Sequence, residues 1–365
     1  MARIFSVASA LPPLQASLEM STFHAQRMSC RSDDEAGKVA KLYRRTGVDS
    51  RGSVLLEEPT AGELTQTFYP PMQDDPQGPS TQDRNDRFAA DAPPLACRAA
   101  AEAIRKSGCE ATQVTHLVTV TCTGFNAPGV DIELIEQLGL PATTQRIQIG
   151  FMGCHALINA MRTARGLVAA DPEACVLICC VELCSLHYQY GYDVQRIVSG
   201  ALFADGAAAL IVVGADCQPA ADTTPIASIA ATGSYLIPNS RDAMTWTIGD
   251  HGFRMTLEAC VPGLVESNLK EYLQGWLAKN NETFDSIGGW AVHPGGVRIL
   301  QAVETAIDLD PAKLDVSRSV LREHGNMSSA TLGVVLERFE STGVPRPWLI
   351  LGFGPGLEVE VALVR

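Results

Sequence analysis

Two kinds of hydrophobic pattern alternate along most of this chain. Short apolar runs typical of buried strands occur at 1–10, 114–121, 145–149, 175–181, 207–213, 286–292, 348–353 and 357–364. Stretches suited to helices occur at 34–46, 95–107, 156–169 and 330–340. Strands that alternate with helices are typical of α/β proteins, so the pattern predicts an α/β fold.

Two polar segments interrupt this alternation. Residues 70–86 contain prolines and charged residues and are expected to form a surface loop. Residues 216–225 form a second break, which divides the chain into 1–217 and 225–365. Each part contains strands followed by a glycine-rich turn and a helix. This arrangement indicates two structurally related halves, although no repeat is visible residue by residue.

Composition narrows the class of protein. With 365 residues, 46% hydrophobic and 19% charged, the chain can bury a large core, which excludes a disordered chain and a small disulfide scaffold. The net charge of −13 repels phosphate backbones and anionic lipids, so neither nucleic acid nor a membrane is an expected partner. The longest apolar runs are too short to span a bilayer, and the first ten residues suit a strand better than an export signal.

The eleven cysteines follow no regular spacing, which in a large acidic chain indicates reduced thiols and a cytoplasmic location. Four of them lie between Cys175 and Cys184. Because the adjacent Cys179 and Cys180 would point to opposite faces of a strand, this group is interpreted as buried apolar side chains. No metal site is therefore expected.

Cys154 is the one cysteine whose surroundings favour reactivity. The run at 145–149 leads into Gly150-Phe151-Met152-Gly153-Cys154, where two glycines allow a tight turn into the next helix. Unpaired amides and the positive end of the helix dipole at such a site favour a thiolate. The turn would also expose the sulfur at the top of a sheet, as in the serine elbow of hydrolases. A buried structural cysteine is the alternative.

His293 and Asn326 are the candidate partners of this thiol. His155 is adjacent in sequence, but consecutive residues on a helix do not face each other. His293 ends a predicted strand and precedes Pro294-Gly295-Gly296, at the edge where α/β folds gather their sites. Asn326 either caps the following helix or donates a hydrogen bond to an oxyanion. All three candidates lie at glycine-flanked turns, and this shared placement favours a joint site.

These segments resemble the type III polyketide synthases, the chalcone synthase-like family of thiolase-fold enzymes. The matching segments are 150–154, 201–209, 292–296, 325–329 and 352–356, in the same order and spacing over nearly the whole chain. Ketoacyl-carrier-protein synthases share the cysteine, histidine and asparagine but lack the His-Pro-Gly-Gly and Gly-Phe-Gly-Pro-Gly segments. The resemblance implies a bacterial-type member with a thiolase-like fold, in which two pseudo-duplicated halves form αβαβα layers.

The resemblance also implies a reaction. Cys154 would accept an acyl group from a starter acyl-CoA, and His293 would stabilise the thiolate. Malonyl-CoA would lose carbon dioxide, and His293 and Asn326 would stabilise the enolate that attacks the acyl-cysteine. No metal or organic cofactor is implied. A homodimer is expected from the family, but Ala127 replaces the methionine that plant members insert into the neighbouring subunit.

Several residues match positions that line the family's reaction chamber. Phe203 matches a gatekeeper between the coenzyme A tunnel and the chamber, and Met255 replaces the phenylalanine of the second gatekeeper. A flexible methionine there favours longer or bulkier starters, and hence alkylpyrone or alkylresorcinol products. A chalcone- or phloroglucinol-type product from another starter is the alternative. The other expected lining residues are Cys122, His187, Gly354, Pro355 and Ser328.

A basic helix face is the candidate site for coenzyme A. Lys38, Lys41 and Arg45 are spaced to lie on one face of the predicted helix at 34–46, where the family carries its basic contacts. A solvated charged face is the alternative. Two other functions share parts of the pattern. A papain-like cysteine hydrolase has the same order of cysteine, histidine and asparagine, but its Cys-Gly-Ser-Cys-Trp signature is missing here. A non-catalytic thiolase-fold protein would not need all three residues.

Overall fold

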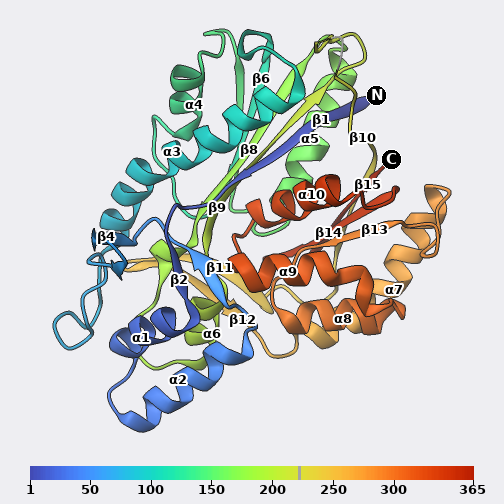
Figure 1. Cartoon of the computed structure of the whole chain (residues 1–365). Helices are drawn as coiled ribbons and strands as arrows, with labels where there is room; N and C mark the ends of the chain where they lie inside the picture. The colour runs from blue at the N-terminus through green and yellow to red at the C-terminus, as the bar shows by residue number, and fades with distance from the viewer. Residues whose placement is uncertain (221–222) are drawn as a thin grey trace.

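The computed structural model describes residues 1–220 and 223–365, and its central feature is one twisted sheet (Figure 1). In the described part of the chain the sheet has nine strands in the order β13-β14-β15-β10-β1-β9-β8-β6-β7. Their bounds are β1 (Ala2–Ala10), β6 (His116–Thr121), β7 (Gln145–Gly150), β8 (Cys175–Leu183), β9 (Asp205–Val213), β10 (Ala227–Leu236), β13 (Gly289–Val292), β14 (Trp348–Gly354) and β15 (Glu358–Val364). Three short pairs complete the strands: β2 (Gln15–Ser17) with β3 (Ser50–Gly52), β4 (Glu57–Thr60) with β5 (Glu63–Thr65), and β11 (Met244–Gly249) with β12 (Gly252–Leu257).

Helices cover the outer faces of both halves of the sheet, and two further helices form a middle layer between the halves. The helices are α1 (Leu18–Ser29), α2 (Asp33–Arg45), α3 (Thr81–Ser107), α4 (Val130–Leu138), α5 (Ala156–Ala170), α6 (Val194–Leu202), α7 (Val261–Lys279), α8 (Val297–Ile307), α9 (Asp315–His324) and α10 (Ala330–Thr342). One apolar cluster joins α5 and α10 to strands of both halves, from β6, β8 and β9 to β14 and β15. A second cluster packs α3 on the outer face of β1, β8 and β9, and a third packs α7 and α8 on β13, β14 and β15. The layers are therefore αβαβα, which confirms the predicted architecture.

The two halves of the sheet repeat one strand order. In the first half the order is β1-β9-β8-β6. Counted along the chain among the sheet strands of that half, the first strand lies beside the last, and the next-to-last and the second strand follow. The order β10-β15-β14-β13 repeats this arrangement in the second half. The halves join where Ala2–Ile4 pairs with Ala227–Ile229. The boundaries at 217 and 225 stay predictions, and residues 221–222 of the predicted break lie outside the described residues.

Most predicted elements are confirmed to within three residues at each end, but α3 is much longer than predicted. It begins at Thr81, behind a capping box formed by Ser80 and Asp83, and continues through Pro93 and Pro94. The predicted loop at 70–86 is therefore wrong in its last part. Adjacent prolines normally favour a break. Here apolar residues on both sides of them, such as Phe88 and Leu95, are buried against the sheet, and this packing outweighs the local preference.

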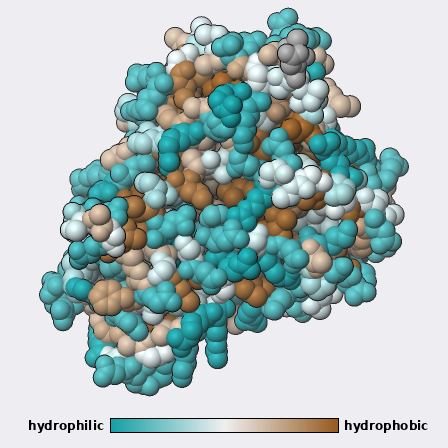
Figure 2. Space-filling view, viewed as in Figure 1, coloured by the Kyte–Doolittle hydropathy of each residue, from teal (hydrophilic) through white to brown (hydrophobic). Residues whose placement is uncertain are grey.

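The surface is mainly polar. Figure 2 shows that the face seen in Figure 1 is largely hydrophilic, with hydrophobic residues visible only in separate patches. None of the described helices combines the length and the apolar character that a membrane span requires.

Candidate active site

The turn that carries Cys154 depends on glycine. Between β7 and α5 the chain turns at Gly153, which has φ +83°, and a Cβ there would lie 2.4 Å from Cδ of Pro355. Because only glycine adopts this conformation freely and leaves this space empty, the turn packs directly against the 352–356 segment. Gly354 of that segment also lacks room for a Cβ, which would lie 2.3 Å from the ring of His155. The two glycine segments therefore fix each other and hold Cys154 just before α5.

The three predicted catalytic side chains share one cavity. Cys154, His293 and Asn326 all line it, and the Cys154 Sγ lies 4.0 Å from the Asn326 Oδ1. His293 follows β13, and its backbone N–H donates to the Leu351 carbonyl at 2.7 Å. Both ring nitrogens of His293 are buried, and neither has a hydrogen-bond partner among residues 1–220 and 223–365. The imidazole is therefore free to form a hydrogen bond with a bound ligand.

The side chain of Asn326 is held at this cavity through its oxygen atom. The Ser328 backbone N–H donates to the Asn326 Oδ1 at 2.8 Å, which leaves the amide NH2 group for a ligand. The backbone of Asn326 bridges to the chain beside Phe203, through Asn326 N–H to Leu202 O at 2.8 Å and Ala204 N–H to Asn326 O at 2.9 Å. Since α10 begins only at Ala330, Asn326 does not cap that helix. The cap interpretation is therefore excluded, whereas the oxyanion-donor role stays a prediction.

Burial disfavours each charge of the cysteine–histidine pair when it stands alone. Burial raises the pKa of the Cys154 thiol to about 12, although hydrogen bonds with Ser328 and Asn326 partly oppose this rise. Burial, with a smaller contribution from His155, lowers the pKa of His293 to about 3. The helix end that was expected to favour the thiolate is present, but burial outweighs it. Burial alone therefore favours the neutral thiol and the neutral imidazole, and stabilisation of a thiolate by His293 stays a prediction.

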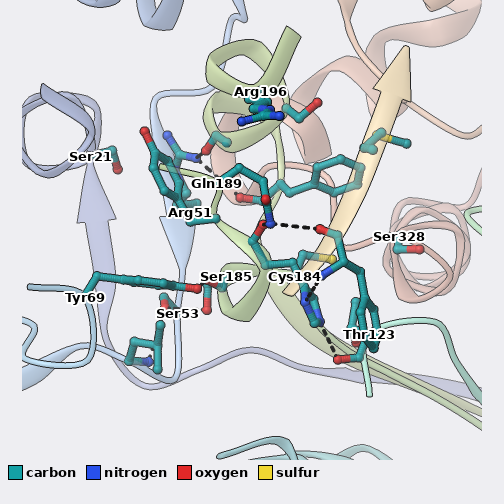
Figure 3. A pocket seen from close by; sticks show the side chains of 18 of the residues that line it. Ser21, Arg51, Ser53, Tyr69, Thr123, Cys184, Ser185, Gln189, Arg196 and Ser328 are labelled. Atoms are coloured by element: carbon teal, nitrogen blue, oxygen red, sulfur yellow. Dashed lines mark hydrogen bonds between the residues drawn. The ribbon is translucent and has the colours of Figure 1, made fainter. Parts of the chain in front are cut away.

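A larger cavity of about 150 Å³ adjoins the same thiol (Figure 3). Its lining includes six of the seven residues expected from sequence: Cys122, His187, Phe203, Met255, Ser328 and Pro355. The prediction for Gly354 is wrong: it does not line the cavity, because it packs against His155 and Met152. Phe203 and Met255 also line the cavity that holds His293, as do Cys154, Ser199 and Met244, so these residues border both spaces.

His187 forms a fixed wall of the larger cavity. Its Nδ1 accepts a hydrogen bond from the Phe253 N–H at 3.0 Å, so its Nε2 carries the proton and donates to the Thr123 carbonyl at 2.6 Å. The ring stacks on Phe253 with 4.1 Å between centroids. Burial lowers the pKa of His187 to about 3, so the ring is neutral. With both nitrogens used, His187 shapes the cavity and takes no part in proton transfer.

Sequence reasoning missed several residues of the site. Glu182, fully buried at the end of β8, accepts hydrogen bonds from the Cys122 N–H at 3.0 Å and the Thr123 hydroxyl at 2.8 Å. Burial raises the pKa of this carboxyl. A single acidic residue in an apolar strand was the available signal. Cys184, interpreted from sequence as a plain buried side chain, lines the larger cavity, as does Trp246 of the unpredicted β11–β12 hairpin.

The candidate coenzyme A residues lie outside both cavities. Lys38, Lys41 and Arg45 are exposed on one side of α2, whereas Val39 and Tyr43 are buried on the other. This confirms that the three basic side chains share a face. Lys38 pairs with Asp34 at 2.6 Å, an exposed contact of small energetic weight. Neither cavity is lined by these residues, and their role in binding stays a prediction.

The layering and the gathered cysteine, histidine and asparagine define a thiolase-like α/β fold with a cysteine-centred site. The family model described as chalcone and stilbene synthases, N-terminal domain, matches residues 2–217, and the corresponding C-terminal domain matches residues 228–365. The chain belongs to the chalcone and stilbene synthase family. This membership replaces the papain-like interpretation of the same three residues.

Named relatives agree with this assignment. The chain is 32% identical over 289 residues to "Probable polyketide synthase 1" of Dictyostelium discoideum, and the match covers 78% of this chain but 9% of that protein. This chain thus corresponds to a small part of that relative's length. The crystal structure of PKS-I from the brown alga Ectocarpus siliculosus superposes with a TM-score of 0.91, at 28% identity, and covers 100% of this chain and 98% of that one. The C-terminal type III polyketide synthase domain of a type I/III hybrid from Dictyostelium shares the fold, with a TM-score of 0.88 at 24% identity and coverage of 100% and 99%.

Proposed function

We propose that this chain is a type III polyketide synthase that loads an acyl-CoA starter on Cys154 and extends it with malonyl-CoA. One observation carries the proposal: Cys154, the unpaired imidazole of His293 and the free amide of Asn326 line one cavity, and Cys154 also opens to a second one. A thiol between an entry space and a reaction space suits covalent transfer of an acyl chain from one to the other.

In the loading step the Cys154 thiolate attacks the carbonyl carbon of the starter thioester. The carbon–sulfur bond to coenzyme A breaks, and His293 returns its proton to the leaving coenzyme A thiolate. The acyl group then remains on Cys154 as a thioester. Because His293 has no other hydrogen-bond partner in the described part of the chain, its proton is available for this exchange.

In the extension step malonyl-CoA loses carbon dioxide and becomes an enolate. The His293 ring, and the Asn326 amide oriented by Ser328, donate hydrogen bonds to the enolate oxygen. The enolate carbon attacks the acyl-cysteine, which forms the new carbon–carbon bond and releases the Cys154 thiolate. The lengthened chain on coenzyme A can then be transferred back to Cys154. This chemistry uses only side chains and the substrates, so the proposed reaction needs neither metal nor organic cofactor.

The preferred product is an alkylpyrone or alkylresorcinol made from a fatty starter. Met255, which borders both cavities as Phe203 does, has a more flexible side chain than a phenylalanine, and this supports long starters. Lys38, Lys41 and Arg45 are proposed to hold the anionic coenzyme A. The protein is proposed to act as a homodimer in the cytoplasm. All eleven cysteines are free, which supports a reducing location.

A starter panel tests the function and the product together. Purified protein is incubated with malonyl-CoA and with acetyl-, benzoyl-, hexanoyl- and palmitoyl-CoA, and the products are identified by mass spectrometry. Pyrones or resorcinols from the fatty starters are expected, with faster turnover than the aromatic starter. Faster turnover of benzoyl-CoA would overturn the product assignment, whereas no starter-dependent consumption of malonyl-CoA would overturn the function itself. Met255→Phe is the matched variant and is expected to lower turnover of palmitoyl-CoA more than that of hexanoyl-CoA.

A further inference from the structure

The cavity beside Cys154 continues far beyond the reacting atoms. Cys154 and Ser328 line one part of it, whereas Ser21, His24 and Met28 of α1 line another. Figure 3 shows Ser21 and Ser328 on opposite sides of this space. The cavity therefore extends from the nucleophile to the inner face of α1.

A third cavity, of about 410 Å³ and called the outer groove below, lies along α1. Met20 and Phe23 of α1, residues 64–67 and Pro70 and Pro71 contribute to its lining. Four residues line both this outer groove and the cavity beside Cys154: His24, Met28, Gln66 and Tyr69. These four side chains form a partition one residue thick between the reaction space and the groove.

Two side chains of the partition are held by hydrogen bonds and two are held by packing alone. The Gln66 amide donates to the Tyr69 carbonyl at 2.9 Å, and the Gln66 Oε1 accepts from the Tyr69 N–H at 2.8 Å. The Tyr69 hydroxyl is held by the Ser185 carbonyl at 2.9 Å. His24 and Met28 make no side-chain hydrogen bond within the described part of the chain, and they lie one turn apart on one face of α1. Movement of these two side chains would join the spaces without breaking a hydrogen bond.

The opposite wall of the cavity offers no comparable exit. His187 is hydrogen-bonded through both nitrogens and stacks on Phe253, which stacks in turn on Phe125 with 6.0 Å between centroids. Opening this wall would leave buried polar atoms unpaired, which is costly. The low-cost route for lengthening the cavity therefore leads toward α1.

We propose that His24 and Met28 form a gate through which the distal end of a long acyl starter passes from the reaction cavity into the groove along α1. The inference rests on the proposed function, because it takes the acyl chain to be attached at Cys154. With its far end in the groove, the starter leaves the space beside Cys154 for the growing polyketide. Burial lowers the pKa of His24, so its ring is uncharged at neutral pH, as contact with a hydrocarbon chain requires.

Chain-length selectivity measures this gate. The ratio of kcat/KM for palmitoyl-CoA to that for hexanoyl-CoA is determined for the wild type, Met28→Ala, His24→Trp and Glu19→Ala. Met28→Ala opens the partition and is expected to raise the ratio about tenfold, whereas His24→Trp fills it and is expected to lower the ratio about tenfold. Glu19→Ala is the matched control, because Glu19 is an exposed residue of α1 that lines neither cavity. Its ratio is expected to stay within about twofold of the wild type.

Turnover of hexanoyl-CoA reports in the same experiment whether each variant is folded. Met28→Leu, which nearly conserves side-chain volume, is expected to retain wild-type selectivity. Variants that keep the wild-type ratio while hexanoyl-CoA is still converted would overturn the gate and leave the proposed function intact. Loss of every starter-dependent activity, the wild type included, would overturn the proposed function and the gate with it.

Discussion

Removal of His293 tests how the site holds a negative charge. In His293→Ala the buried Cys154 loses the one side chain of the shared cavity that can become its counter-ion. No imidazolium can then oppose the burial that raises the pKa of this thiol. We expect the wild-type protein to form a thiolate–imidazolium pair that reacts at neutral pH, and the variant to hold a neutral thiol.

The size of the effect follows from the pKa. At pH 7 a thiol with a pKa of about 12 is ionised in roughly one molecule in 10⁵, whereas an ordinary cysteine with a pKa of about 8.5 is ionised in about 3%. The two fractions differ by roughly 10³. Since alkylation requires the thiolate, the Cys154 alkylation rate of the variant at pH 7 is expected to fall at least about 100-fold below the wild-type rate.

The assay is iodoacetamide labelling between pH 5 and pH 10, with the Cys154 peptide quantified by mass spectrometry so that the other ten cysteines do not interfere. The wild type is expected to reach a plateau near neutral pH, whereas the rate for the variant should still rise at pH 10. His116→Ala, which removes a buried histidine at the far end of β6, is the control and should behave as the wild type does. Equal rates for the wild type and His293→Ala at pH 7 would refute the pairing.

Three further predictions concern the turn, a buried carboxyl and the basic face of α2. Gly153→Ala places a Cβ in an occupied space at φ +83° and should lower the free energy of unfolding by about 2–4 kcal/mol in urea, whereas Gly166→Ala, with open space around its Cβ, should be neutral or stabilising. Burial raises the pKa of Asp205 from 3.8 to about 6. The neutral carboxyl therefore contributes about 3 kcal/mol of stability below pH 3.8, and this contribution is lost as the pH rises through about 6. Denaturation at several pH values should show this decline in the wild type but not in Asp205→Asn. Replacing Lys38 and Lys41 by Ala should raise the KM for acyl-CoA substrates with little change in kcat, and an unchanged KM would remove these residues from the coenzyme A site.

Local sequence signals predicted that Cys154, His293 and Asn326 share a site, because glycine-flanked turns mark each of them, and the structure places all three in one cavity. What burial does to them depends on distant segments that only the fold brings together. The position of Cys154 just before α5 indicated a thiolate, but burial of the side chain raises the pKa of Cys154. Gly354 looked like a lining residue because its segment faces the site, but its missing side chain makes room for His155.

Long-range packing explains the other differences from prediction. Pro93 and Pro94 read locally as a helix break, whereas burial of α3 against the sheet carries the helix through them. Glu182 gains its role only from hydrogen-bond donors far away in the chain, such as Thr123. The extension of the cavity to α1 likewise depends on residues 21–28 lying opposite the 184–189 segment, and no spacing along the chain indicates this.

The central claim is that Cys154 carries the acyl chain. Intact-protein and peptide mass spectrometry after brief incubation with hexanoyl-CoA, without malonyl-CoA, tests it directly. The account predicts one hexanoyl group per chain, located on the Cys154 peptide and released by hydroxylamine, and no adduct in Cys154→Ala. An adduct on another residue, or an unchanged mass in the folded wild-type protein, would contradict it.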